Sequence, residues 1–202
     1  MTTVVVPFRG SDSKRRLDSV PEPGRVLLAE AMLADVLDAA LAVGRVLVVA
    51  TEVPELPYGV ELVPDPRRGQ GAAVQAALEA APLSPAGAYL VVNADLPCAT
   101  ARDLLALAGA IPEGGLALAV AADGTTNALG FADVSVFEPL YGPGSAERFA
   151  ALAPSRVVDA PNLIDDVDTL DDLLRVAPRV GPHTARVLRA LPPFFIDRGA
   201  AA

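Results

Sequence analysis

The sequence has 202 residues and a formal net charge of −9, and hydrophobic residues make up 52% of it. This length suits one domain, which we expect to span residues 1–202, and the apolar content argues against disorder. An acidic chain lacks the basic footprint of a nucleic-acid-binding protein. The single cysteine, Cys98, has no partner for a disulfide within the chain. Because we find no signal peptide and no membrane-spanning pattern, we expect a cytoplasmic protein with no membrane partner.

The first residues predict a buried strand followed by a basic loop. Residues 2–7 are a β-branched run that ends at a proline. The loop at residues 9–17 is the densest cationic patch of this acidic chain and includes Lys14 and Arg16. A run of charges usually marks a solvated surface. Because this loop leaves the end of a strand, we favour contact with phosphate.

The next segments predict a strand–helix–strand unit. Residues 24–43 place apolar side chains at three- and four-residue spacing, which is typical of an amphipathic helix. Strands are expected at residues 45–51 and 60–63. Gly69 and Gly71 then open an alanine-rich helix. Their small size would let a base or a phosphate approach the backbone, and a turn with a tightly packed helix is an equal alternative.

The chain is organised around residues 89–97, where an apolar run leads to Asp95 and is stopped by Pro97. Such a run predicts a strand buried on both faces, as in a parallel sheet covered by helices. Ligands bind beyond the carboxyl ends of these strands. A carboxylate there is costly unless it is paired, and a hard cation such as magnesium is a suitable partner. The alternative is a turn or helix-cap aspartate.

The following stretch predicts a helix and two strands. The helix is expected to begin at Thr100 or Ala101, and a strand to follow at residues 116–122. Residues 123–129 are polar and rich in turn formers, and the chain becomes strand-like again up to Phe131.

A second glycine loop at residues 141–146 contains Gly142 and leads into a short helix that begins near Ser145. A serine behind glycines at a helix start can help to bind an anion, and it can equally be an ordinary N-cap.

A cluster of acids follows the last short strand, which is expected at residues 156–159. Residues 165, 166 and 168 are aspartates, and carboxylates this close repel each other unless a cation lies nearby. In an extended backbone Asp166 and Asp168 would lie on one face. The acids can also simply neutralise a helix start. Because Asp95 and Asp168 both follow strands, we favour a metal site that the two share.

The end of the chain predicts two helices, at residues 170–176 with Thr169 as N-cap, and at residues 182–191. His183 is the only histidine and has no catalytic partner motif, so we expect a surface or structural role. Cys98 has no nearby base and is expected to be a small apolar filler.

Five motifs in this order resemble one family: SKRRL at residues 13–17, ADLP at 94–97, GTTNAL at 124–129, YGPGS at 141–145 and DVDT at 166–169. Together they are similar to the guanylyltransferases of deazaflavin-coenzyme (F420) biosynthesis, which act on 2-phospho-L-lactate or phosphoenolpyruvate. The resemblance covers nearly the whole chain. It implies an α/β fold of the Rossmann-like (GT-A-like) nucleotidyltransferase type, a three-layer sandwich with a mostly parallel central sheet.

The resemblance also implies a magnesium cofactor, GTP, a small phosphorylated three-carbon acid, and roles for individual residues. Asp95 and Asp168 would hold the metal, and Lys14 and Arg16 would face the triphosphate and act with Asp95 in catalysis. Gly69 and Gly71 would lie beside the guanine. The phosphate or carboxylate of the acid would be bound by Thr126, Asn127, Gly142 and Ser145.

The implied reaction needs no general base, because the attacking phosphate oxygen is already ionised at neutral pH, its second pKa being about 6. Catalysis would then rest on positioning and charge neutralisation. One alternative is a molybdopterin or sugar-phosphate nucleotidyltransferase, although those usually carry a longer glycine-rich signature after the first strand. Another is a non-catalytic nucleotide-binding regulator. A homodimer or a transient contact with the next pathway enzyme is compatible with this resemblance. The sequence does not choose between phosphoenolpyruvate and 2-phospho-L-lactate.

Overall fold

The computed structural model describes residues 2–10, 17, 20–52, 56–81 and 87–190. The apolar runs of these residues form one seven-stranded sheet in the order β3-β2-β1-β4-β6-β5-β7. The predicted basic-loop residues Lys14 and Arg16 lie outside the described residues. The strands are β1 (Thr2–Pro7), β2 (Gly44–Ala50), β3 (Val60–Pro64), β4 (Tyr89–Val92), β5 (Leu116–Val120), β6 (Thr126–Phe131) and β7 (Ser155–Val157).

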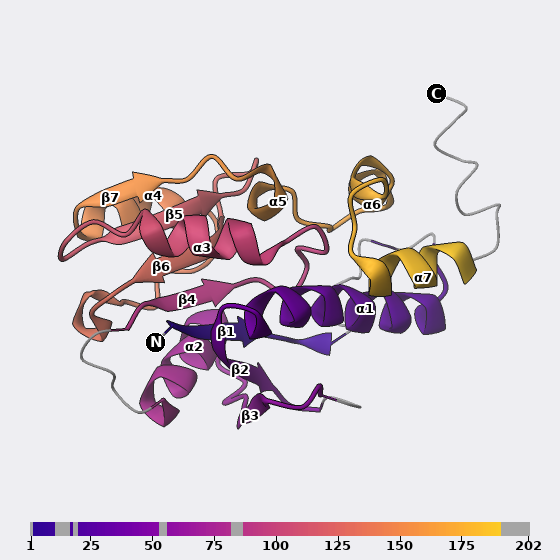
Figure 1. The fold of residues 1–202 in the computed structure, drawn as a ribbon, viewed down its shortest axis with the longest axis horizontal. Coiled ribbons are helices and arrows are strands. Elements are labelled where there is room, and N and C mark those ends of the chain that lie inside the picture. Colours follow the sequence, from indigo (N-terminus) through magenta and orange to yellow (C-terminus); the bar gives the residue numbers. More distant parts are fainter. Residues whose placement is uncertain (1, 11–16, 18–19, 53–55, 82–86, 191–202) are drawn as a thin grey trace.

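Helices cover both faces of the sheet, which makes the three layers that were predicted. Apolar side chains of α1, α3 and α5 pack on one face, and those of α2 and α4 pack on the other (Figure 1). None of the helices in the described ranges combines the length and the apolar character needed to cross a membrane. The helices are α1 (Glu22–Leu41), α2 (Gln70–Ala80), α3 (Ala101–Gly109), α4 (Ser145–Leu152), α5 (Pro161–Ile164), α6 (Leu170–Val176), α7 (Pro182–Ala190) and the 3-10 helix η2 (Val134–Val136).

One strand of the mostly parallel sheet runs the other way. β6 pairs antiparallel with both β4 and β5, whereas the remaining neighbours are parallel. A tight turn joins β5 to β6: Ala121 donates its N–H to the carbonyl of Thr125 at 2.9 Å, and Gly124 turns the chain with φ 82°. The start of β6 therefore lies at the same sheet edge as the end of β4, and this edge carries the site.

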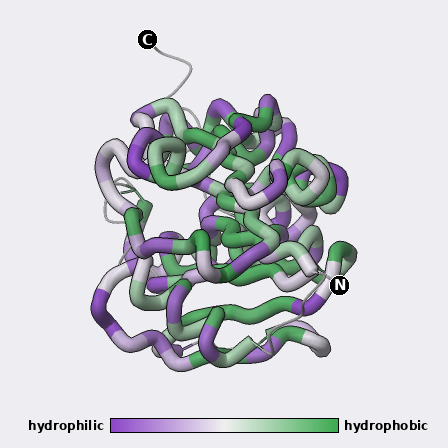
Figure 2. Tube along the Cα trace, turned by 90° about the vertical axis from the view of Figure 1, so that its left-hand side faces the viewer, coloured by the Kyte–Doolittle hydropathy of each residue, from purple (hydrophilic) through white to green (hydrophobic). Residues whose placement is uncertain are grey.

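Alternation along the central strands builds the core. Val4 and Val6 point to the α1 side of the sheet and Val5 points to the α2 side, and all three are fully buried. Burying one such side chain contributes about 1.5–3 kcal/mol. Figure 2 shows hydrophobic segments running through the middle of the molecule, while many of the loops around them are hydrophilic. A sheet buried on both faces leaves its edge as the place for a polar site.

A third apolar cluster joins α1 to α6 and α7, and it includes the buried thiol of Cys98, as predicted. The start of α7 is held by Asp35 of α1, whose carboxylate accepts the backbone N–H groups of His183 and Thr184, each at 2.9 Å. The ring of His183 lies 3.0 Å from the carboxylate of Asp38. The structural role predicted for this histidine is confirmed.

Element boundaries differ from the sequence prediction in a few places. The first helix begins at Glu22 and ends at Leu41, two residues earlier at each end than expected. It can start earlier because Pro23 fits the first turn of a helix, and it ends earlier because β2 already begins at Gly44. The strand predicted at residues 156–159 is shorter and ends at Val157, and an unpredicted short helix, α5, follows it.

Candidate active site

Three half-buried carboxylates converge at the sheet edge. Asp95 follows β4, while Asp166 and Asp168 lie between α5 and α6, and one oxygen of each lies within 4.8 Å of the others. The backbone N–H of Val167 donates to the carbonyl of Asp95 at 3.1 Å, which docks the second segment on the first. The predicted meeting of Asp95 and Asp168 is therefore present, and Asp166 joins them as a third member that was not assigned to the metal.

The electrostatics of this cluster suit a divalent cation. Burial, and the charges of Asp95 and Asp168 beside it, raise the pKa of Asp166 to about 6, although a hydrogen bond from Asn127 favours its ionised form. A bound cation would reverse this penalty, because it favours the charged carboxylates. All the donors are carboxylate oxygens, and hard cations such as Mg²⁺ prefer such ligands. The residues present therefore fit a hard divalent cation.

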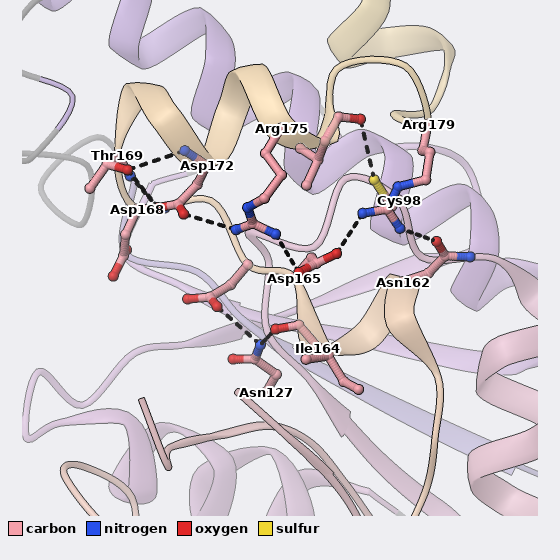
Figure 3. Close-up of polar contacts among 12 residues, drawn as sticks. Cys98, Asn127, Asn162, Ile164, Asp165, Asp168, Thr169, Asp172, Arg175 and Arg179 are labelled. Atoms are coloured by element: carbon pink, nitrogen blue, oxygen red, sulfur yellow. Dashed lines mark hydrogen bonds and ion pairs between the residues drawn. The ribbon is translucent and has the colours of Figure 1, made fainter. Parts of the chain in front are cut away.

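Two arginines anchor residues 165–168, the acidic segment that carries Asp166 and Asp168 (Figure 3). Asp165, next to Asp166 in the chain, forms ion pairs with Arg175 and Arg179. Arg175 also pairs with Asp172 at 2.9 Å. The side chain of Arg179 also donates to Asn162 of α5 at 2.9 Å. Because these guanidinium groups are bound to Asp165, they hold the segment in place without occupying the acidic cluster itself.

The start of α6 fixes the other end of the segment. Thr169 is the N-cap, as predicted: its hydroxyl accepts the N–H of Asp172 at 3.2 Å, and the Asp172 carboxylate accepts the N–H of Thr169 at 2.9 Å. This reciprocal pair is a capping box with aspartate in place of the usual glutamate. Asp168 directly precedes this N-cap, so its backbone is held by the start of the helix.

A pocket of about 170 Å³ adjoins Asp95. Arg9, two residues after the end of β1, lines it together with Asp95, so that a cationic residue and a carboxylate border the same space. Sequence reasoning did not single out Arg9 within the basic loop. The lining residues are Pro7, Phe8, Arg9, Ala29, Met32, Gln70, Asn93, Ala94 and Asp95.

The two glycines predicted beside the guanine have different surroundings. Gly69 is the N-cap of α2 with φ 98°, and a Cβ on it would lie 3.8 Å from the guanidinium of Arg9, so it lies beside a residue of the pocket wall. A Cβ on Gly71 would lie 2.5 Å from the Cβ of Pro139. At Gly71 the absence of a side chain therefore allows tight packing against Pro139, which was the alternative interpretation of this glycine pair.

The residues predicted to bind the acid come together, but their side chains are turned inward. Thr126, Asn127 and Ser145 are at most 2% exposed. The hydroxyl of Ser145 accepts the backbone N–H of Thr126 at 2.9 Å and donates to the Thr126 hydroxyl at 3.1 Å. The idea that Ser145 is the N-cap is wrong, because Gly144 occupies that position. Direct contact of these side chains with a substrate stays a prediction.

The glycine loop before α4 is shaped by Arg148. Its guanidinium donates to the carbonyls of Leu140 at 2.9 Å and Pro143 at 2.6 Å, and it also reaches the carbonyl of Gly142. Gly142 has φ 110°, a conformation that favours glycine. The loop thus lies against the start of β6, where Ala146 donates its N–H to the carbonyl of Gly124 at 3.2 Å.

Comparison with known proteins adds a family context to this geometry. Residues 15–157 match the MobA-like NTP transferase domain family. The phosphoenolpyruvate guanylyltransferase of Roseiflexus sp. is 34% identical over 206 residues, covering 94% of this chain and 89% of the relative. The 2-phospho-L-lactate guanylyltransferase of Natrialba magadii is 36% identical over 197 residues, covering 86% of this chain and 82% of the relative. A solved nucleotidyl transferase from Methanothermobacter thermautotroptrophicus has a TM-score of 0.65 at 16% identity, covering 95% of this chain and 99% of that one, and its likeness concerns the fold alone.

Proposed function

Because this chain belongs to the family of the phosphoenolpyruvate and 2-phospho-L-lactate guanylyltransferases, we propose that it transfers GMP from GTP to the phosphate of one of these acids. Pyrophosphate is the second product, and the reaction belongs to the biosynthesis of the deazaflavin coenzyme F420. The observation that carries the proposal is the convergence of three carboxylates beside a pocket whose wall also holds Arg9.

The bond changes need charge control more than proton transfer. A phosphate oxygen of the acid attacks the α-phosphorus of GTP, a new P–O bond forms, and the bond to the β-phosphate oxygen breaks as pyrophosphate leaves. The attacking oxygen is already ionised at neutral pH. This agrees with the position of His183, whose ring is paired with Asp38 on α1.

The residues of the chain divide the task. Asp95 and Asp168, with Asp166 beside them, would hold magnesium, which supplies positive charge to the α-phosphate and the leaving pyrophosphate. Arg9 would bring its guanidinium to the phosphates from the pocket wall. Lys14 and Arg16, from the same loop, are proposed to face the triphosphate.

Two further groups of residues are proposed to position the substrates. Gly69, at the start of α2, leaves the backbone open beside the pocket for the nucleotide. The paired segments around Thr126 and Ser145 place the Gly142 loop near the start of β6, and this supports a role in binding the acid. A homodimer and a contact with the next pathway enzyme remain open predictions.

A substrate panel tests the proposed function. GTP is incubated with Mg²⁺ and, in turn, phosphoenolpyruvate, 2-phospho-L-lactate and 3-phosphoglycerate, and both pyrophosphate release and the product mass are measured. We expect a product that contains GMP joined to one of the first two acids, and a much slower reaction when ATP or CTP replaces GTP. Turnover only with a sugar phosphate or a molybdopterin acceptor would contradict the proposal. GTP binding without turnover on any acceptor would instead favour a non-catalytic regulator.

A further inference from the structure

Three side-chain amides link the pocket wall to the acidic cluster. Gln70, at the start of α2, donates Nε2–H to the Oδ1 of Asn93 at 2.7 Å, and Asn93 donates Nδ2–H to the Oδ1 of Asn127 at 3.3 Å. Asn127 in turn donates Nδ2–H to the Oδ1 of Asp166 at 3.2 Å and to the carbonyl of Ile164 at 2.9 Å. Figure 3 shows the last part of this row, with Asn127 reaching up to Ile164 beneath the anchored segment.

The sheet register places the middle of this row. Val92 of β4 lies opposite Ala128 of β6, and the N–H of Asn93 donates to the carbonyl of Asn127 at 2.9 Å. The two asparagines are therefore neighbours across an antiparallel pair, where opposed side chains lie close enough to interact. The antiparallel pairing of β6 with β4 brings the two side chains together at this edge of the sheet.

The row has one direction, which is set by its last member. An ionised carboxylate only accepts hydrogen bonds, so Asn127 must present its N–H₂ to Asp166 and its oxygen to Asn93. Asn93 must then present its own N–H₂ to Asn127 and its oxygen to Gln70. Reversing any one amide would set two oxygens, or two N–H₂ groups, against each other.

We propose that Gln70, Asn93 and Asn127 form an amide relay of positioning residues, which holds Asp166 in the geometry that a divalent cation requires. This inference rests on the proposed function, because it assumes that the acidic cluster binds a cation. Gln70 and Asn93 also line the nucleotide pocket. The relay therefore makes the pocket wall and the cation site one hydrogen-bonded unit, and Asn127 acts through Asp166 rather than on a substrate.

Burial of Asn127 makes its orientation matter. Asn127 is 1% exposed, so water has little access to its amide, and an amide that turns away from Asp166 loses this contact. Loss of one net hydrogen bond to the carboxylate corresponds to about a two- to tenfold weaker cation affinity.

The test is a Mn²⁺ titration of the nucleotide-free protein, with free Mn²⁺ followed by electron paramagnetic resonance. Gln70→Glu places an oxygen against the Oδ1 of Asn93, so that Asn93 turns round and Asn127 loses its ordered bond to Asp166. The added negative charge alone would tighten Mn²⁺ binding. The relay predicts the opposite, a Kd raised about two- to tenfold, with a smaller rise for Gln70→Leu, which removes the donor without forcing the reversal.

Gln75→Leu is the matched control, because Gln75 is an exposed amide on the same helix that bonds only to Glu79 in the described part of the chain, at 3.1 Å. Its Mn²⁺ affinity should be unchanged, and thermal unfolding of all samples separates loss of binding from loss of fold. If Gln70→Glu does not fold, the comparison of Gln70→Leu with Gln75→Leu decides. Equal or tighter binding in both Gln70 variants would overturn the relay while the proposed function stands. Failure of the unchanged protein to bind Mn²⁺ would overturn both.

Discussion

Replacing Gly71 with alanine tests the packing of the helix that opens onto the pocket. The new Cβ would lie 2.5 Å from the Cβ of Pro139 and 2.9 Å from its carbonyl oxygen. Both distances are shorter than van der Waals contact, and a backbone carbonyl cannot swing aside as the end of a long side chain can. We therefore expect the start of α2 to be pushed away from Pro139.

The magnitude follows from two opposing terms. Overpacking of this kind costs about 1–3 kcal/mol. Alanine within a helix recovers about 0.5–1 kcal/mol relative to glycine. The difference is a net loss of up to about 2.5 kcal/mol with a central value of roughly 1 kcal/mol, and at about 2–4 °C per kcal/mol for a chain of this size that central value lowers the Tm by roughly 2–4 °C.

The assay is urea and thermal unfolding, with Gly109→Ala as the matched control. Gly109 ends α3, and no heavy atom outside its own helix and chain neighbours lies within 4 Å of the position of a new Cβ. The control should therefore gain up to about 1 kcal/mol, a change of opposite sign. If Gly71→Ala keeps full stability but loses GTP binding, the packing argument is wrong and Gly71 serves the nucleotide directly.

Two further predictions concern buried polar contacts. Asp35→Ala removes the acceptor for the N–H groups of His183 and Thr184. We expect the free energy of unfolding in urea to fall by about 2 kcal/mol and proteolysis within α7 to become faster. Unchanged proteolysis would argue against this capping role. Ser145→Ala leaves the buried N–H of Thr126 without its acceptor and should lower the free energy of unfolding by about 1–3 kcal/mol. An unchanged Tm together with a raised KM for the acid would instead show that the hydroxyl contacts the substrate.

Much of the fold could be predicted because the central strands are apolar on both faces. The runs that became β1, β2 and β4 carry no polar face, which indicates a parallel sheet covered by helices. The direction of β6 was not predicted, because strand direction depends on the turn before it and on pairing partners far away in the chain. The stretch expected to be a polar turn at residues 123–129 instead begins β6 at Thr126.

Part of the site could be predicted because two of its residues stand out in the local sequence. Asp95 follows an apolar strand and Asp168 precedes a capped helix, so each is marked by its local sequence. The prediction assigned the metal to Asp95 and Asp168 and left open whether Asp166 joins them, because sequence spacing does not show where its side chain points; in the structure all three converge. The amide relay was not foreseen, because the contact between Asn93 and Asn127 depends on the register of β4 against β6.

The role of Gly71 illustrates a further limit. Its neighbour Pro139 is distant in sequence, so the choice between nucleotide contact and tight packing needed the three-dimensional arrangement. Similarly, Gly144 is the N-cap of α4, and the hydroxyl of Ser145 is bonded to Thr126 of β6, a contact that local sequence could not indicate.

The most direct measurement of the central claim is a crystal structure of the protein grown with Mn²⁺, in which the metal is located by its anomalous scattering. We expect one strong peak bonded to carboxylate oxygens of Asp95 and Asp168, with Asp166 as a third ligand or beside it, and no such peak in crystals of Asp95→Asn. A fully occupied Mn²⁺ bound elsewhere, with the three carboxylates bare, would contradict the account.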